Sequence, residues 1–203
     1  MSSAFAAARL WWGLCVLLAA GALLAGAVPS ARLDWQPSLA ASEPWRAWSA
    51  AWVHWSPLHL AANLAGCAVL GALGLSARLG PSWALAWFAA WPLTHWGLLL
   101  LPASAGPLLH FGGLSGVLHA GVAVTVLALL QRPGRDRRIG LAIAAGLIAK
   151  LWLEQAWTGP AMREVAGWDI AVVPFSHFSG AVAGGLCGTV AATWQRLCGP
   201  APH

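Results

Sequence analysis

The stretch HFGGLSGVLHAG, residues 110–121, lies between two apolar runs and is itself rich in glycine, histidine and serine. A glycine-rich turn between hydrophobic helices would explain this composition in structural terms. A serine that follows two glycines and begins a helix could instead be an exposed nucleophile. The choice between these interpretations depends on where the stretch lies in the fold.

The composition is that of a membrane protein. Of the 203 residues, 59% are hydrophobic and only 8% are charged, and 15 are tryptophan. Soluble domains carry about 25% charged residues, so we predict an all-α protein that crosses a bilayer several times. The net charge of +5 does not imply a nucleic-acid partner, because four of the 11 basic residues crowd into QRPGRDRRIG (131–140). A short basic loop beside an apolar helix is typical of a cytoplasmic anchor.

Six apolar stretches approach the roughly 20 residues that span a bilayer. We predict a single membrane domain over residues 1–203, with helices at about 10–28, 57–77, 82–101, 115–131, 139–157 and 172–194. The first stretch could instead be a cleaved signal peptide, since Arg9 precedes it and small residues follow it. Its apolar core exceeds the usual length of roughly 7 to 15 residues, which favours a retained helix.

The segment between the first two helices, LDWQPSLAASEPWRAWSAAWVHWS (33–56), contains five tryptophans. Amphipathic indole rings favour the headgroup layer of a membrane. We therefore predict that this first loop lies in the interface.

Basic residues are divided unequally between the two sides of such a six-helix topology. The side of the termini holds Arg9, Arg78, Arg132, Arg135, Arg137, Arg138 and Arg196. The other side holds Arg32, Arg46 and Arg163, with Lys150 late in the fifth helix. The positive-inside rule therefore predicts that both termini are cytoplasmic.

Ser115 is predicted to lie below the opposite, non-cytoplasmic surface. The fourth helix runs about 17 residues from Ser115 to the charge at Arg132, or about 26 Å, whereas a hydrocarbon core is about 30 Å thick. The loop before Ser115 must then descend into the membrane, where irregular backbone is tolerated only beside protein or a water-filled cavity. The sequence thus predicts a water-accessible pocket with a serine at its floor.

Three further polar residues reach the same depth. By the same helical rise, His177 and His59 lie about 28 Å from the inner charges and Asn63 about 22 Å. Polar residues inside a membrane are functional candidates by default, and their convergence at one level with Ser115 strengthens the hypothesis. The structural alternatives are a helix cap for Ser115 and interhelical hydrogen bonds for His59 and Asn63.

A stripe of glycines follows His177 on one face of its helix. It consists of Gly180, Gly184 and Gly188. Small residues let a second helix approach closely, and if that helix is the fourth, His177 can take the proton of Ser115. No acidic residue is expected near the pair, so we predict a Ser/His dyad.

Lys150 and Glu154, four residues apart, are predicted to form a local ion pair, with recognition of a substrate terminus as the minor alternative.

Donors for a developing oxyanion are also predicted near Ser115. Gly112 and Gly113 permit backbone conformations that other residues avoid, and the N–H groups that begin a helix lack intrahelical acceptors. His59 and Asn63, one helical turn apart, could add side-chain donors.

Three motifs together resemble a known family. GLSG (113–116), HLAAN (59–63) and HFSGAVAGG (177–185) are similar, in order and spacing, to the GxSG, HxxxN and HxxG elements of rhomboid intramembrane serine proteases. The Trp-Arg pair at 45–46 resembles the first loop of that family. The resemblance covers about residues 10–195. It implies a six-helix rhomboid-like bundle with an interfacial first loop and a short central fourth helix.

The resemblance also implies roles for individual residues. Ser115 would be the nucleophile and His177 the general base and acid, while His59, Asn63 and the Ser115 backbone N–H would form the oxyanion hole. Residues that would support the site are Gly113, Gly116, His119 and Gly180. His119 departs from the family, in which many members carry tyrosine one turn after the serine; it could stack on His177 or tune the pocket.

Within the family, the compact body and three stretches resemble the rhombosortases. These stretches are EPWRAWSAAWVHWSPLHLAANLAG (43–66), GLSGVLHAG (113–121) and KLWLEQ (150–155). This resemblance implies exported, membrane-anchored substrates with a GlyGly-CTERM tail, which comprises a glycine-rich motif, a transmembrane stretch and a basic end. It also implies the bacterial inner membrane, with the site open to the periplasm, and no cofactor.

Other functions fit the sequence less well. A membrane zinc protease would need a pattern such as HExxH, which is absent, so we predict no metal site. The four cysteines form no CxxC pair and three of them lie in apolar runs, which favours structural thiols over disulfides. A transporter would show internal repeats. A non-catalytic rhomboid-like protein would usually lack the serine or the histidine. A general rhomboid protease of other transmembrane substrates remains an alternative, and the acyl group could pass to water or to an amine acceptor.

Overall fold

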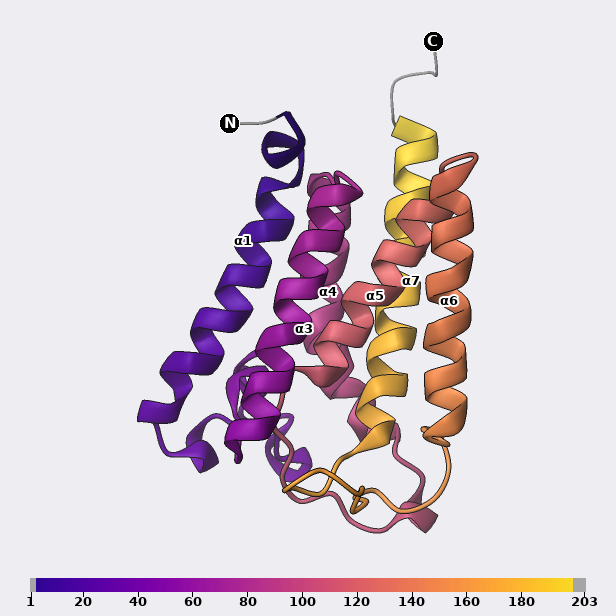
Figure 1. Ribbon diagram of the computed structural model, residues 1–203. Helices are drawn as coiled ribbons and strands as arrows, with labels where there is room; N and C mark the ends of the chain where they lie inside the picture. Colours follow the sequence, from indigo (N-terminus) through magenta and orange to yellow (C-terminus); the bar gives the residue numbers. More distant parts are fainter. Residues whose placement is uncertain (1–2, 199–203) are drawn as a thin grey trace.

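A computed structural model describes residues 3–198 as helices and loops, with no strand in that range (Figure 1). Its long helices are α1 (Ser3–Leu24), α3 (Pro57–Ser76), α4 (Pro81–Trp96), α5 (Ser115–Leu130), α6 (Arg135–Leu153) and α7 (Pro174–Cys198). A single turn, α2 (Arg46–Ser49), lies in the first loop, and short 3-10 turns occur at Ala25–Ala27, Ser30–Arg32, Pro37–Leu39, Ala50–Trp52, Gly97–Leu100 and Ala103–Ala105. The predicted all-helical fold is confirmed.

The long helices run alternately up and down, so that the three long loops 25–56, 97–114 and 154–173 gather at one end (Figure 1). Each long helix corresponds to one predicted span, but several ends differ. α4 ends at Trp96 rather than near residue 101, and α6 begins at Arg135, so its first turn carries the basic cluster. The chain termini predicted to be cytoplasmic, residues 1–2 and 199–203 of the predicted 1–203 domain, lie outside the described residues.

Within residues 3–198, two segments are long and apolar enough to cross a membrane by length and composition, Ala6–Ala27 and Pro57–Ser76. α5 is apolar but has only 16 residues, fewer than the roughly 20 that a full span requires. Six membrane crossings therefore remain a prediction.

Capping residues fix where the site-bearing helices begin. The Ser56 side chain accepts a hydrogen bond from the His59 N–H at 3.0 Å, and Pro57 occupies the first helical position of α3. α7 likewise begins at a proline, Pro174. His59 and His177 are consequently both held in the first turn of their helices.

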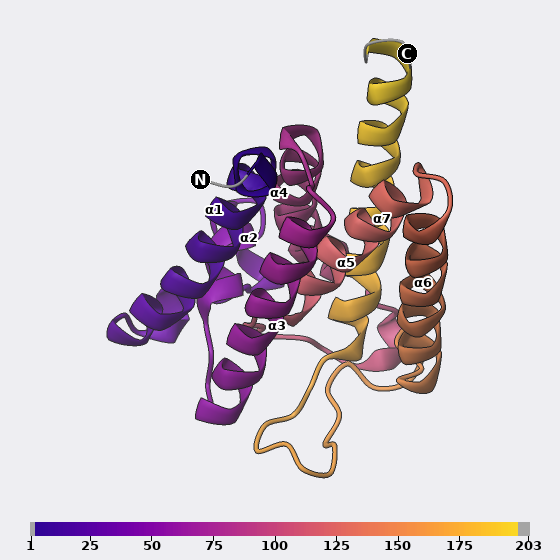
Figure 2. The ribbon, with the colours of Figure 1, turned by 45° about the horizontal axis from the view of Figure 1, so that its top comes forward.

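α5 is the central helix of the bundle (Figures 1 and 2). Most of its residues are buried, and it packs chiefly against α7 and also against α3, α4 and α6. This short, surrounded helix corresponds to the predicted fourth span.

The predicted small-residue contact between α5 and α7 is present. A Cβ atom at Gly180 would collide with the Gly116 carbonyl, and one at Gly184 would collide with the backbone of Ala120. Only glycine allows the two backbones to come this close.

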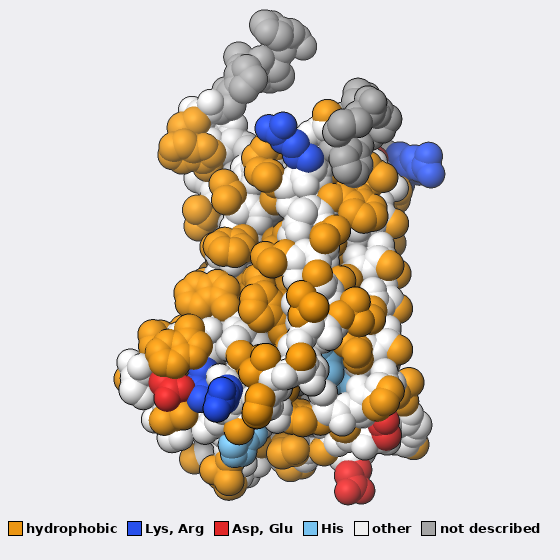
Figure 3. Space-filling view, turned by 90° about the vertical axis from the view of Figure 1, so that its left-hand side faces the viewer, with side chains coloured by type: hydrophobic (Ala, Val, Ile, Leu, Met, Phe, Trp, Pro, Cys, Tyr) orange, Lys and Arg blue, Asp and Glu red, His pale blue; other side chains and the backbone are white. Residues whose placement is uncertain are grey.

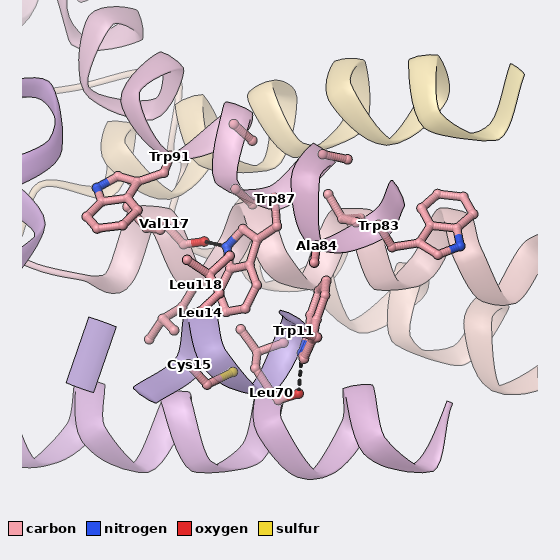
Figure 4. Close-up of a cluster of buried hydrophobic side chains, with 14 of the residues drawn as sticks. Trp11, Leu14, Cys15, Leu70, Trp83, Ala84, Trp87, Trp91, Val117 and Leu118 are labelled. Carbon is pink, nitrogen blue, oxygen red and sulfur yellow. Dashed lines mark hydrogen bonds between the residues drawn. The ribbon is translucent and has the colours of Figure 1, made fainter. Parts of the chain in front are cut away.

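Tryptophans join the remaining helices through the core (Figure 4). Trp87 of α4 donates its indole N–H to the Val117 carbonyl of α5 at 2.8 Å, and Trp11 of α1 donates to the Leu70 carbonyl of α3 at 2.9 Å. The Trp11 and Trp87 ring centroids are 4.5 Å apart. Buried indoles that satisfy their N–H in this way add both apolar contact and orientation. The four cysteines are free, and two of them, Cys15 and Cys67, are buried.

The first loop combines exposed and buried tryptophans. Trp45, Trp48 and Trp55 are exposed, as expected for an interfacial segment, whereas Trp35 is fully buried. Arg46 is buried and pairs with Asp34 at 3.2 Å and Glu43 at 2.6 Å. The ring of Trp35 packs into a second apolar cluster under the loop and is therefore part of the protein core.

The face of the molecule drawn in Figure 3 carries a broad apolar band, with charged side chains toward its two ends. A belt of this kind is the surface expected of a protein embedded in lipid.

Candidate active site

Ser115 and His177 meet at the loop-bearing end of the bundle. Ser115 is the first residue of α5, and His177 lies in the first turn of α7. The Ser115 Oγ is 3.0 Å from the His177 Nε2, within hydrogen-bond distance. The contact follows from the glycine packing, because Gly116 and Gly180 bring the backbones together just beside the two side chains.

A cavity of about 860 Å³ opens beside this pair. All the predicted polar site residues line it, namely His59, Asn63, Ser115, His119 and His177. Its other walls are mostly apolar side chains of α3, α5 and the loop before α7. A cavity with a serine on its wall thus exists where the sequence predicts one.

His119 packs against the histidine of the pair. Its ring is stacked on that of His177, with centroids 4.2 Å apart and planes inclined by 14°. Its Nδ1 lies 2.6 Å from the Ser115 carbonyl oxygen, so the ring is also fixed to its own helix. The stacking predicted as one of two possibilities for His119 is present.

An acidic residue lies next to His177, and the prediction that none would do so is wrong. Glu154 follows the last residue of α6, and its Oε2 is 2.8 Å from the His177 Nδ1. Its Oε1 contacts the Lys150 ammonium, so the predicted Lys150–Glu154 ion pair is also present. The hydrogen bond with the His177 Nδ1 and the contact with the Lys150 ammonium both favour the ionised form of the Glu154 carboxyl. Glu154 is therefore a carboxylate.

The turn before Ser115 needs its two glycines. Gly113 has φ of 133°, a value that side chains disfavour, and a Cβ atom there would lie 2.6 Å from the His59 ring. A Cβ atom at Gly112 would lie 2.8 Å from Val53. The Gly113 N–H bonds the Ala50 carbonyl at 2.9 Å. The N–H of Ser115, at the start of α5, is one of the groups without an intrahelical acceptor.

His59 and Asn63 face the cavity from α3 and are both buried. The Nδ2 of Asn63 lies 2.9 Å from the His54 Nε2, and the His54 Nδ1 lies 3.1 Å from the Trp52 carbonyl. Burial lowers the pKa of His54 despite the opposing carbonyl contact, so the ring is neutral at pH 7 and can accept the amide hydrogen. His54 thereby orients Asn63 toward the site.

The loop 154–173 forms one wall of the cavity and extends beyond the helix ends (Figure 2). Two contacts tie it to the start of α3. Ser56 donates a hydrogen bond to Asp169 at 2.6 Å, and the Trp168 ring lies edge-on to His59 with centroids 6.3 Å apart. The wall is therefore anchored on the helix that carries His59 and Asn63.

Sequence reasoning missed the parts played here by Glu154, His54 and Asp169. The i, i+4 spacing predicted the Lys150–Glu154 ion pair. It did not predict the contact of Glu154 with His177, because a 20-residue loop separates α6 from α7. His54 and Asp169 lie in loops, where no helical periodicity relates them to the site.

Comparison with known proteins identifies a family for the chain. The sequence of residues 41–194 matches the family model of the Rhomboid domain. This range is about three quarters of the chain and includes every site residue described above. None of the curated proteins matches the chain at a significant level. The chain therefore belongs to the Rhomboid family, integral membrane proteins that are generally intramembrane serine proteases acting on membrane-protein substrates.

Proposed function

We propose that this chain is an intramembrane serine endopeptidase with Ser115 as its nucleophile. The 3.0 Å contact between the Ser115 Oγ and the His177 Nε2 carries the proposal. A serine hydroxyl is a weak nucleophile until an adjacent base can remove its proton, and His177 is placed to do so. Membership of a family of intramembrane proteases supports the same reaction class.

Acylation would begin with attack of the Ser115 Oγ on a substrate carbonyl carbon while its proton moves to the His177 Nε2. The Ser115 N–H and the side chains of His59 and Asn63 would donate hydrogen bonds to the oxyanion that forms. His177 would then give its proton to the leaving amine as the peptide bond breaks. The product is an ester between Ser115 and the carbonyl side of the substrate.

The ester can be resolved in two ways. Water can attack the acyl carbon while His177 takes a proton from it, which releases a carboxylate and restores Ser115. An amine acceptor can attack instead, which leaves an amide and likewise restores the serine. Both routes use the same residues, and the mass of the product distinguishes them.

We propose six membrane crossings, with both termini in the cytoplasm of a bacterial inner membrane and the cavity open to the periplasm. The basic cluster at the start of α6 lies at the end of the bundle opposite Ser115, which supports this orientation under the positive-inside rule. The whole chain would form a single domain.

The proposed substrates are exported proteins with a GlyGly-CTERM tail. Similarity to the rhombosortases supports this class. The chemistry agrees, because glycines weaken a helix and so expose backbone carbonyls to a recessed serine. A tail with other residues in place of the glycines would need more free energy to unwind its helix.

A fluorophosphonate probe should label the purified protein in lipid vesicles, with the added mass on the peptide that contains Ser115. Co-expressed with a Gly-Gly tailed substrate, the protein should release a product lacking the tail. Replacing the two glycines by leucines should lower this release by about tenfold or more, since the helix then resists unwinding.

Absence of labelling on Ser115 would refute the serine mechanism. Equal processing of the Gly-Gly and Leu-Leu tails would retain the protease but refute the tail specificity. A product heavier than the hydrolysed fragment would indicate transfer to an acceptor.

Asn63→Ala should lower kcat by about 10- to 100-fold, because one oxyanion donor is lost while the Ser115 N–H remains. KM should change little, since the oxyanion exists only after attack. His54→Ala should lower kcat less, because it frees the Asn63 amide without removing it. Steady-state kinetics on a fluorogenic transmembrane peptide would measure both effects, and an unchanged kcat in Asn63→Ala would contradict the assigned role.

A further inference from the structure

Glu154 is joined to the Ser115–His177 pair through the far nitrogen of the histidine. Its Oε2 is 2.8 Å from the His177 Nδ1, while the Nε2 of the same ring is 3.0 Å from the Ser115 Oγ. The three side chains therefore form a continuous chain of hydrogen-bonding groups. The His177 side chain is 11% exposed and that of Glu154 is 26% exposed, so solvent competes weakly for the contact between them.

The backbone around Glu154 is fixed by its own set of contacts. Its N–H bonds the Lys150 carbonyl at 2.9 Å, which closes the last turn of α6. Its carbonyl accepts a hydrogen bond from Arg163 at 2.5 Å. The next residue, Gln155, has φ of 45°, so the chain turns out of the helix at this point. The carboxylate thus lies on a defined helix end rather than on a free loop.

The two oxygens of the carboxylate have different partners. Oε1 contacts the Lys150 ammonium and Oε2 contacts His177. The ion pair orients the carboxylate and leaves one oxygen for the imidazole. On the other side, the stacked ring of His119 limits tilting of the His177 plane.

This arrangement has a specific consequence for the proton on His177. A carboxylate can only accept, so the Nδ1 must carry the hydrogen, and the Nε2 then has the lone pair that takes the Ser115 proton. When that proton arrives, the ring is a cation beside a carboxylate, which stabilises it. The same carboxylate prevents the ring from rotating away between steps.

We propose that Glu154 is a positioning residue that completes a Ser115–His177–Glu154 triad and selects the reactive tautomer of His177. The proposal rests on the function proposed above, in which Ser115 attacks and His177 moves the proton. It replaces the dyad that the sequence predicts.

Glu154→Gln is the main test, because it keeps the size of the side chain and removes the charge. We expect kcat on a fluorogenic transmembrane peptide to fall by about 10- to 100-fold with little change in KM, and Glu154→Asp to recover part of the loss. Glu164→Gln is the matched control, since Glu164 is an exposed glutamate in the loop that follows α6. It should retain the kcat of the unmodified protein.

A second measurement does not depend on catalysis. In protein labelled with ¹⁵N-histidine, the His177 signals, identified by their loss in His177→Ala, should report a hydrogen on Nδ1. In Glu154→Ala this preference should be lost. Lys150→Met, which removes the ion pair but not the contact of Glu154 with His177, should keep it.

A kcat in Glu154→Gln within about twofold of the unmodified protein would overturn the proposal. So would an unchanged His177 tautomer in Glu154→Ala, or equal losses of kcat in Lys150→Met and Glu154→Gln, because the helix end rather than the imidazole would then be the relevant partner. Failure of the serine mechanism itself gives a different result, namely no labelling of Ser115 in the unmodified protein.

Discussion

Replacing Ser115 by alanine is expected to lower the rate of peptide cleavage by at least about 10³-fold, and replacing His177 by alanine by a similar factor. Without the hydroxyl no acyl-enzyme can form, and without the imidazole the hydroxyl keeps its proton. Because the two groups act in one step, the double variant should be no slower than either single variant. Cleavage of a co-expressed substrate and fluorophosphonate labelling would both measure the loss.

Ser179→Ala provides a matched control for this experiment. Ser179 is a buried serine of α7 that donates to the Thr94 carbonyl at 2.8 Å and does not line the cavity. The variant loses a hydrogen bond worth about 1 kcal/mol of stability, yet it should keep its activity. Substantial cleavage by Ser115→Ala or His177→Ala, in protein as stable as this control, would contradict the assigned mechanism.

The serine and histidine could be predicted because their placement depends on regular features of a helix. The rise per residue predicts that Ser115 and His177 lie at one level, and the glycine spacing after His177 identifies the face that meets α5. The structure brings these two side chains into contact as expected.

Glu154 could not be predicted in this way. Its contact with His177 depends on the path of the loop 154–173, in which the sequence has no periodic pattern. The residue is visible in the sequence only as the i+4 partner of Lys150. An acid near a catalytic histidine is therefore easily overlooked when it follows the last turn of a helix and is separated from that histidine by an irregular loop.

The first loop shows a second limit. Five closely spaced tryptophans predict an interfacial segment, but composition cannot tell which rings face lipid. The ring of Trp35 is buried where the loop pairs with Phe111, through hydrogen bonds of 2.8 and 2.9 Å between their backbones. That pairing joins segments about 75 residues apart in the chain, so nothing local in the sequence indicates it.

Gly180→Ala is expected to impair both stability and activity, because the α5–α7 contact has no space for a methyl group. The added Cβ would overlap the Gly116 carbonyl oxygen and lie 2.7 Å from its carbon, and backbone atoms cannot rotate aside. Overpacking of this kind costs about 1–3 kcal/mol. The helices would have to separate beside the Ser115–His177 contact, and a misplacement of about 1 Å can lower a rate by about 100-fold.

Gly185→Ala is the matched control for Gly180→Ala, since it is the same substitution on the same helix. A Cβ at Gly185 meets nothing within 4 Å, and alanine favours a helix over glycine by up to about 1 kcal/mol. The control should therefore keep its activity and unfold at the same or a slightly higher temperature, whereas Gly180→Ala should unfold at a lower temperature and lose at least about 100-fold in activity. Thermal unfolding in detergent and cleavage kinetics on the same samples separate the two variants. Equal behaviour would mean that α5 and α7 can move apart without disturbing the serine and the histidine, and the close backbone contact would then not be what holds the pair together.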